Sequence, residues 1–247
     1  MSKRISHVFL LLLLGLVVLG AAVVRAQDRP APAAAAPART APTARTGFYI
    51  ENSQTSFLPA ATYHATGSFR FWSWAELNSA PGVYHFNKID QYINNAVANG
   101  YQAIGIAVTT YVGRPSGCTM QGIEYTPLFV RNGPDGIAGN ADDPIIRAQV
   151  DFSRTCGGTP ITKPWYLLEY TDPYYKQQYA IFINALANYL LNHPQRSRIG
   201  WVAIGTGKDG ENKPADDTDD PTLQANGLTK TAWMDFVKWA IDTYHTA

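Results

Sequence analysis

Four short runs rich in apolar residues occur along the chain after residue 46. They are residues 47–51, 68–74, 103–108 and 199–204. The last two runs are apolar at nearly every position, which is typical of strands buried on both faces of a parallel sheet. The run 68–74 is rich in aromatic residues and alternates roughly, as strands do. We therefore expect four strands.

Helical periodicity follows the second, third and fourth of these predicted strands. Asn87 can cap the first helix with Asp90 as its partner, because an Asn side chain can accept from the free N–H groups of the first turn. Asp172 can cap the second helix, and Thr229 the third. The predicted helices span residues 87–100, 172–193 and 229–247.

Strands alternating with helices over short connections predict right-handed parallel crossovers and an α/β fold. The sequence favours the amino-terminal half of a TIM (β/α)8-type barrel, with about four strand-helix units. An open, doubly wound sheet is the alternative, although the glycine-rich phosphate turn expected after its first strand is missing. Four parallel strands cannot close on themselves, so two open barrel edges would allow self-association.

The amino terminus has the pattern of an export signal. Lys3 and Arg4 precede an apolar run, and Ala26 ends a small-x-small cleavage site. We predict a signal peptide over residues 1–26, an Ala/Pro/Thr-rich linker over 27–46 and one folded domain over 47–247. The protein would then be secreted, with no membrane contact after cleavage. An uncleaved amino-terminal anchor is the alternative.

Composition and net charge limit the kinds of binding partner that we expect. The net charge of +1 gives no electrostatic reason to expect nucleic acid as a partner. Aromatic residues make up 12% of the chain, and Tyr and Trp side chains suit both sugar binding and core packing. In an oxidising compartment Cys118 and Cys156 can form a disulfide, with two buried free thiols as the alternative.

A long insertion between residues 109 and 163 has no clear periodicity. It contains four oxygen-bearing side chains at short intervals, with glycines between them, and oxygen-rich loops of this kind suit Ca²⁺. A plain polar turn is the alternative. No other cofactor is expected. The candidate calcium ligands are Asp135, Asn140, Asp142 and Asp143.

Two stretches resemble the clan A glycoside hydrolases, and most closely the β-galactosidases of glycoside hydrolase family 42. Residues 70–90 keep a tryptophan-rich strand end, a Gly-x-Tyr-x-Phe pattern and an Ile-Asp pair. Residues 199–211 end in Gly-x-Gly-x-x-Gly-Glu, which is also similar to the fourth-strand region of β-amylases. Gly210 stands where family 42 has an asparagine. The resemblance covers about residues 47–247.

This resemblance implies hydrolysis of O-glycosidic bonds in a carbohydrate substrate by two carboxylates. Glu211 would be the general acid/base, and a solvated loop glutamate is the alternative. The clan's nucleophile follows a seventh strand, which these 247 residues do not contain, so the chain would be an amino-terminal fragment. A non-catalytic carbohydrate-binding or cell-surface protein built on the same half-barrel is the other functional hypothesis.

Five further residues are candidates for substrate binding. Trp72 and Trp74 could form the floor of a sugar subsite, or pack in the core. The resemblance implies that Arg70 pairs with a carboxylate inside the barrel. A surface arginine is the alternative. Tyr111 and Trp165 flank the long insertion and could line the cleft, although each is also a plausible core residue.

Overall fold

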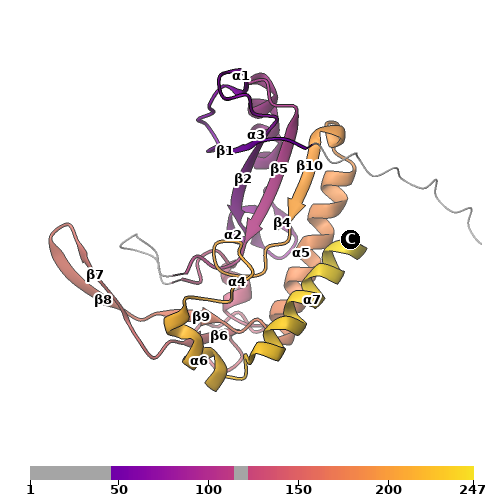
Figure 1. Cartoon of the computed structure of the whole chain (residues 1–247). Coiled ribbons are helices and arrows are strands. Elements are labelled where there is room, and N and C mark those ends of the chain that lie inside the picture. The colour runs from indigo at the N-terminus through magenta and orange to yellow at the C-terminus, as the bar shows by residue number, and fades with distance from the viewer. Residues whose placement is uncertain (1–45, 114–121) are drawn as a thin grey trace, which may run out of the picture. The chain divides into compact units, whose positions relative to one another are not determined.

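The computed structural model describes residues 46–113 and 122–247. Its centre is a four-stranded sheet in which every neighbouring pair is parallel, in the order β1-β2-β5-β10 (Figure 1). The four predicted strands are therefore confirmed, as is the mixed α/β class. Their bounds are Tyr49–Glu51 for β1, Gly67–Ser73 for β2, Ala103–Thr109 for β5 and Ile199–Ala203 for β10.

Three long helices accompany the sheet, as predicted. The Oδ1 of Asp172 accepts a hydrogen bond from the N–H of Tyr175 at 2.8 Å, and Thr229 caps the last helix. The predicted cap at Asn87 is wrong, because Phe86 occupies that position without a side-chain bond. The long helices are α3 (Asn87–Ala98), α5 (Pro173–Leu191) and α7 (Lys230–Thr246).

Shorter elements order the connections. The connection between β5 and α5 contains two antiparallel pairs, β6 (Ile145–Arg147) with β9 (Tyr166–Leu168) and β7 (Phe152–Cys156) with β8 (Thr159–Lys163). A small hairpin joins β3 (Asn78–Ala80) to β4 (Val83–Tyr84). The short helices are α1 (Ala60–Tyr63), α2 (Trp74–Leu77), α4 (Leu128–Arg131) and α6 (Asp220–Ala225), with 3₁₀ turns at Arg196–Arg198 and Asp217–Asp219.

One face of the sheet packs against α3 and α5. On that face the Trp72 ring meets Tyr92 of α3 edge-on, with ring centroids 5.1 Å apart. Trp74, which begins α2, contacts Tyr179 and Phe182 of α5. These rings form the centre of the hydrophobic core.

The opposite face carries a second set of aromatic rings, on alternate residues of the strands. Trp201 contacts both Tyr49 and Phe69, and Phe69 contacts Phe71. The Trp201 ring lies over Gly105, since a Cβ there would come within 2.2 Å of it. Phe71 is 36% exposed, so this face is partly open to solvent.

The two fully apolar strands differ in burial. Every residue of β5 is buried, as predicted for the centre of a parallel sheet. The same prediction is wrong for β10, whose residues after Ile199 are only partly buried. The reason is its place in the described sheet, where β10 has a neighbour on one side only.

Several predictions fall on residues 1–45 and 114–121, outside the described ranges. They are the signal peptide, nearly all of the linker, and Cys118. Cys156, at the end of β7, is disulfide-bonded. Across the described ranges, no helix is both long enough and apolar enough to span a membrane.

Candidate functional site

The carboxyl ends of the four parallel strands lie at one edge of the sheet, where α/β folds place their ligands. A pocket of about 540 Å³ opens there beside the ends of β1 and β2. Its lining includes Glu51, Gln54, Arg70 and Phe71. Acidic, amide, basic and aromatic groups are thus gathered at this carboxyl edge.

The loop after β10 is fixed to this edge through its backbone. Lys208 forms a parallel bridge with Tyr111, which follows β5. The N–H of Asp209 donates to the carbonyl oxygen of Tyr111 at 2.7 Å, and the N–H of Glu211 donates to that of Lys208 at 2.7 Å. The pairing of β5 and β10 therefore continues past both strands and holds Asp209 and Glu211 in a tight turn.

Two glycines allow this turn to approach the sheet closely. A Cβ at Gly205 would lie 1.7 Å from the carbonyl oxygen of Val108. Gly210 has a φ of +79°, and a Cβ there would lie 2.8 Å from the ring of Phe71. A side chain at either position would push the loop away from the sheet. Gly210 thereby connects the loop to the pocket that Phe71 lines.

Asp209 is the residue that sequence reasoning missed. Its φ of +52° lies in the left-handed region, which is uncommon for a residue with a side chain. Partial desolvation raises the pKa of its carboxyl group. The Lys208 ammonium opposes that rise, while the negative charges of Glu211 and Asp216 add to it. The Asp-Gly pair at 209–210, a common turn signal, was the available clue.

Glu211 lies two residues further along, and both Asp209 and Glu211 are exposed. The structure therefore brings the predicted acid/base to the carboxyl edge and places a second carboxylate, Asp209, beside it on the same loop. The Nζ of Lys208 lies 2.5 Å from Oδ1 of Asp216, and the same ammonium also interacts with the Asp209 carboxylate. That contact and the nearby Asp209 raise the pKa of Lys208, which keeps it charged.

Other carboxylates converge on the same region. Desolvation raises the pKa of the Tyr125 hydroxyl, and the charges of Asp209, Glu76 and Glu124 raise it further. Tyr125 belongs to the insertion after β5, and its carbonyl oxygen accepts from the N–H of Ala75 at 2.8 Å. The loops after β2, β5 and β10 therefore place their acidic groups around one phenol.

Arg70 does pair with a carboxylate, as the resemblance implies, but the partner is local. Its Nη2 lies 3.1 Å from Oε1 of Glu76, with the two side chains 18% and 27% exposed. Lys88 approaches the same oxygen at 3.6 Å, and the Arg70 guanidinium lies over the Trp72 ring. Glu76 therefore has a structural role and holds Arg70 at the rim of the pocket.

The predicted aromatic subsites need correction. The side chains of Trp72, Trp74, Tyr111 and Trp165 are fully buried. The Trp165 indole N–H donates to the Tyr111 hydroxyl at 2.9 Å, so these two form an internal pair. None of the four presents a ring face to a ligand, because each is covered by helices or by the insertion. Core packing, the alternative interpretation, describes them.

The predicted calcium loop is held by its own hydrogen bonds. Asp135 accepts from the N–H of Ile137 and from Nδ2 of Asn140, each at 2.8 Å. Asp143 is buried and accepts from the N–H of Gly139 at 2.6 Å. The backbone of Asp142 lies close to Gly133, since a Cβ added at Gly133 would be 2.7 Å from the Asp142 carbonyl oxygen. This arrangement is that of a polar turn, and calcium binding stays a prediction.

In the described ranges no three His, Cys, Asp or Glu side chains gather as a metal site. Comparison with protein-family models and with curated protein sequences found no match for this chain.

Proposed function

We propose that the protein acts on carbohydrate at the carboxyl edge of its sheet and hydrolyses O-glycosidic bonds. The observation that supports this most directly is the Asp209–Glu211 loop. It places two carboxylates together at the end of a parallel strand, and the environment of one of them raises its pKa. Two carboxyl groups, one protonated and one ionised, are what glycoside hydrolysis requires.

The chemistry assigns a different part to each group. An acid gives its proton to the glycosidic oxygen as the bond to the anomeric carbon breaks, and water adds to that carbon while losing its proton to a base. Asp209 is the better candidate for the proton donor, because the upward direction of its pKa shift favours the protonated form. Glu211, the acid/base implied by the resemblance, then supplies the negative charge next to it.

We also propose that the sheet is the amino-terminal half of a (β/α)8-type barrel. Each successive strand joins the sheet beside the previous one, in the order β1-β2-β5-β10. A doubly wound sheet instead reverses direction at a switch point. Helices α3 and α5 contribute side chains to the same face, as the outer layer of a barrel does. The edges at β1 and β10 are then the surfaces for self-association.

An activity screen of the full chain against chromogenic glycosides tests the proposal. Asp209→Asn and Glu211→Gln should each lower turnover by about 100-fold or more, the usual effect of losing a general acid or base. Asp242→Asn, at an exposed position on α7, is the control and should not change turnover. If both site variants turn over at the rate of the unmodified chain, the proposal is wrong.

A non-catalytic carbohydrate-binding protein is the second candidate. The exposure of Glu211 favours it, because an exposed polar side chain on a loop can contact a glycan without taking part in bond cleavage. Under this hypothesis the full chain binds glycans without cleaving any glycoside of the panel.

A further inference from the structure

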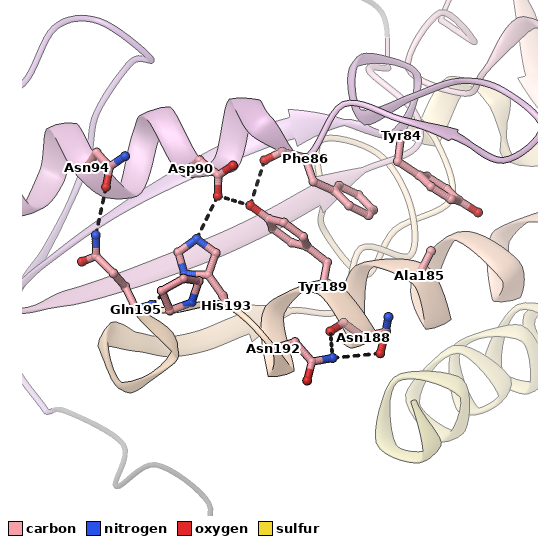
Figure 2. A pocket seen from close by; sticks show the side chains of 11 residues that line it. Tyr84, Phe86, Asp90, Asn94, Ala185, Asn188, Tyr189, Asn192, His193 and Gln195 are labelled. Carbon is pink, nitrogen blue, oxygen red and sulfur yellow. Dashed lines mark hydrogen bonds and ion pairs between the residues drawn. The ribbon is translucent and has the colours of Figure 1, made fainter.

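A second hollow lies between α3 and the last turns of α5 and shares no residue with the carboxyl edge. It is a groove of about 870 Å³, within the size range of small-molecule sites. Figure 2 shows its side chains: those of α3 face those of α5 and of the segment that follows it. We call it the α3–α5 groove.

One wall of the α3–α5 groove is held by a buried histidine. The Nε2 of His193 lies 2.9 Å from Oδ1 of Asp90, and the imidazole is only 6% exposed (Figure 2). The Nδ1 of the same ring accepts from the N–H of Gln195 at 3.0 Å, so the ring's proton is on Nε2 and is donated to Asp90. The Tyr189 hydroxyl also bonds to this carboxylate. The polar wall is therefore preorganised.

Four side-chain amides line the same groove and are paired across it or along it. The Nε2 of Gln195 donates to Oδ1 of Asn94 at 2.9 Å, and the Nδ2 of Asn192 donates to Oδ1 of Asn188 at 3.0 Å. Each pair uses one donor and one acceptor. A further donor on Asn94 and Asn188, and a further acceptor on Gln195 and Asn192, then remain for a ligand.

An aromatic plate completes the lining. The rings of Tyr84 and Phe86 are stacked, with centroids 5.1 Å apart and planes 8° apart. Phe86 is buried against Tyr189. Tyr84 is partly exposed and lines the groove. A flat ring beside fixed amides suits a ligand with an apolar face and a polar rim.

The charged side chains that line the groove indicate which class of ligand it can bind. The lining includes one carboxylate, Asp90, and neither lysine nor arginine. Phosphates and acidic sugars would therefore meet a negative wall without a cation to pair with. Hydroxyl groups both donate and accept, which matches the remaining amide atoms. We propose that the α3–α5 groove is a binding site for a neutral carbohydrate chain, separate from the carboxyl-edge site and independent of its chemistry.

Affinity electrophoresis of the full chain in gels with starch, xylan, mixed-linkage β-glucan or galactomannan tests this proposal. We expect retardation by at least one of these neutral glycans and none by polygalacturonate. Asn188→Ala and Tyr84→Ala should each weaken the binding by about 3- to 10-fold, the effect of one hydrogen bond or one ring contact. Asn184→Ala is the matched control, because it is an exposed amide of α5 outside the groove.

The chain carrying both Asp209→Asn and Glu211→Gln separates this site from the proposed catalytic one. It should be retarded as strongly as the unmodified chain, whether or not the unmodified chain cleaves any glycoside. Three results would overturn the proposal: no retardation by any neutral glycan, equal retardation by polygalacturonate, or groove variants that bind as well as Asn184→Ala. Loss of binding in the double variant would assign the glycan to the carboxyl edge instead.

Discussion

The backbone N–H of Asp209 donates a hydrogen bond of 2.7 Å to the carbonyl oxygen of Tyr111, which joins the loop after β10 to the end of β5. This contact links residues almost a hundred positions apart in the sequence. It continues the parallel pairing of the two strands and fixes the left-handed backbone of Asp209. The candidate acid is therefore held by the sheet rather than by a free loop.

Replacing Gly210 should destabilise the protein more than replacing a glycine of similar backbone geometry elsewhere. Gly210→Ala meets both a φ of +79° and the Phe71 ring at 2.8 Å. Gly136→Ala is the matched control, since its φ is +74° with no atom within 4 Å. The shared strain should cost about 1 kcal/mol in each variant, and urea unfolding should show a larger loss for Gly210→Ala. Equal losses would mean that Phe71 moves aside freely.

The pH dependence of stability should reveal the environment of Asp209. Because its pKa is higher in the folded chain than the ordinary 3.8, ionisation of this group disfavours the folded state. Below pH 3.8 the Asp209 carboxyl group is protonated in both the folded and the unfolded chain, so it does not change the free energy of unfolding. As the pH rises from 3.8 to the raised pKa, the unmodified chain becomes less stable relative to Asp209→Asn. The free energy of unfolding of Asp209→Asn, relative to that of the unmodified chain, should increase across that pH range. Above the raised pKa this difference should stay constant.

The control for that titration is Asp242→Asn, whose side chain is exposed on α7. The difference in unfolding free energy between Asp242→Asn and the unmodified chain should not show the same dependence on pH. Under the proposed function, turnover has a matching alkaline limb, because the protonated acid is lost as the pH rises. An Asp209→Asn variant that is less stable than the unmodified chain at neutral pH would contradict the raised pKa.

Trp74 should behave as a core residue rather than as a sugar subsite. Its ring is fully buried against Tyr179, with centroids 5.0 Å apart, and its Nε1 donates to Oδ1 of Asn78 at 3.2 Å. Trp74→Phe should lower the free energy of unfolding by about 1–3 kcal/mol, through lost packing and the unpaired amide. Trp233→Phe, on the partly buried face of α7, should cost less.

Glycan binding measured below the melting temperature of Trp74→Phe should match that of the unmodified chain. A specific loss of binding at full folding, checked by near-UV circular dichroism, would restore Trp74 as a ligand-contacting residue.

The open sheet predicts self-association. The strands β1 and β10 each have one neighbour in the described sheet, and a two-fold axis along a barrel would place β10 of one copy parallel to β1 of the other. Light scattering of the full chain should then give twice the mass of one chain. Phe71→Lys places a charge on the aromatic face and should give the single-chain mass. An unmodified chain that remains monomeric at high concentration would contradict this prediction.

The positions of the strands and of two helix starts can be predicted from the amino-acid sequence. Apolar runs located all four strands to within two residues, and Asp172 and Thr229 marked the starts of two helices. These features are readable because hydrophobic patterning and capping depend on residues within a few positions of each other. The class of fold follows from their alternation.

Contacts between side chains that are far apart in the sequence become visible only in the folded chain. Asp90 looks like part of a capping box, yet its carboxylate is used by His193, which lies 103 positions away. Trp72 and Trp74 have the composition of a sugar platform, and burial by α3 and α5 makes them core. The raised pKa of Asp209 depends on desolvation and on neighbouring charges from the assembled loops, and these exist only after the strands have been brought into one sheet.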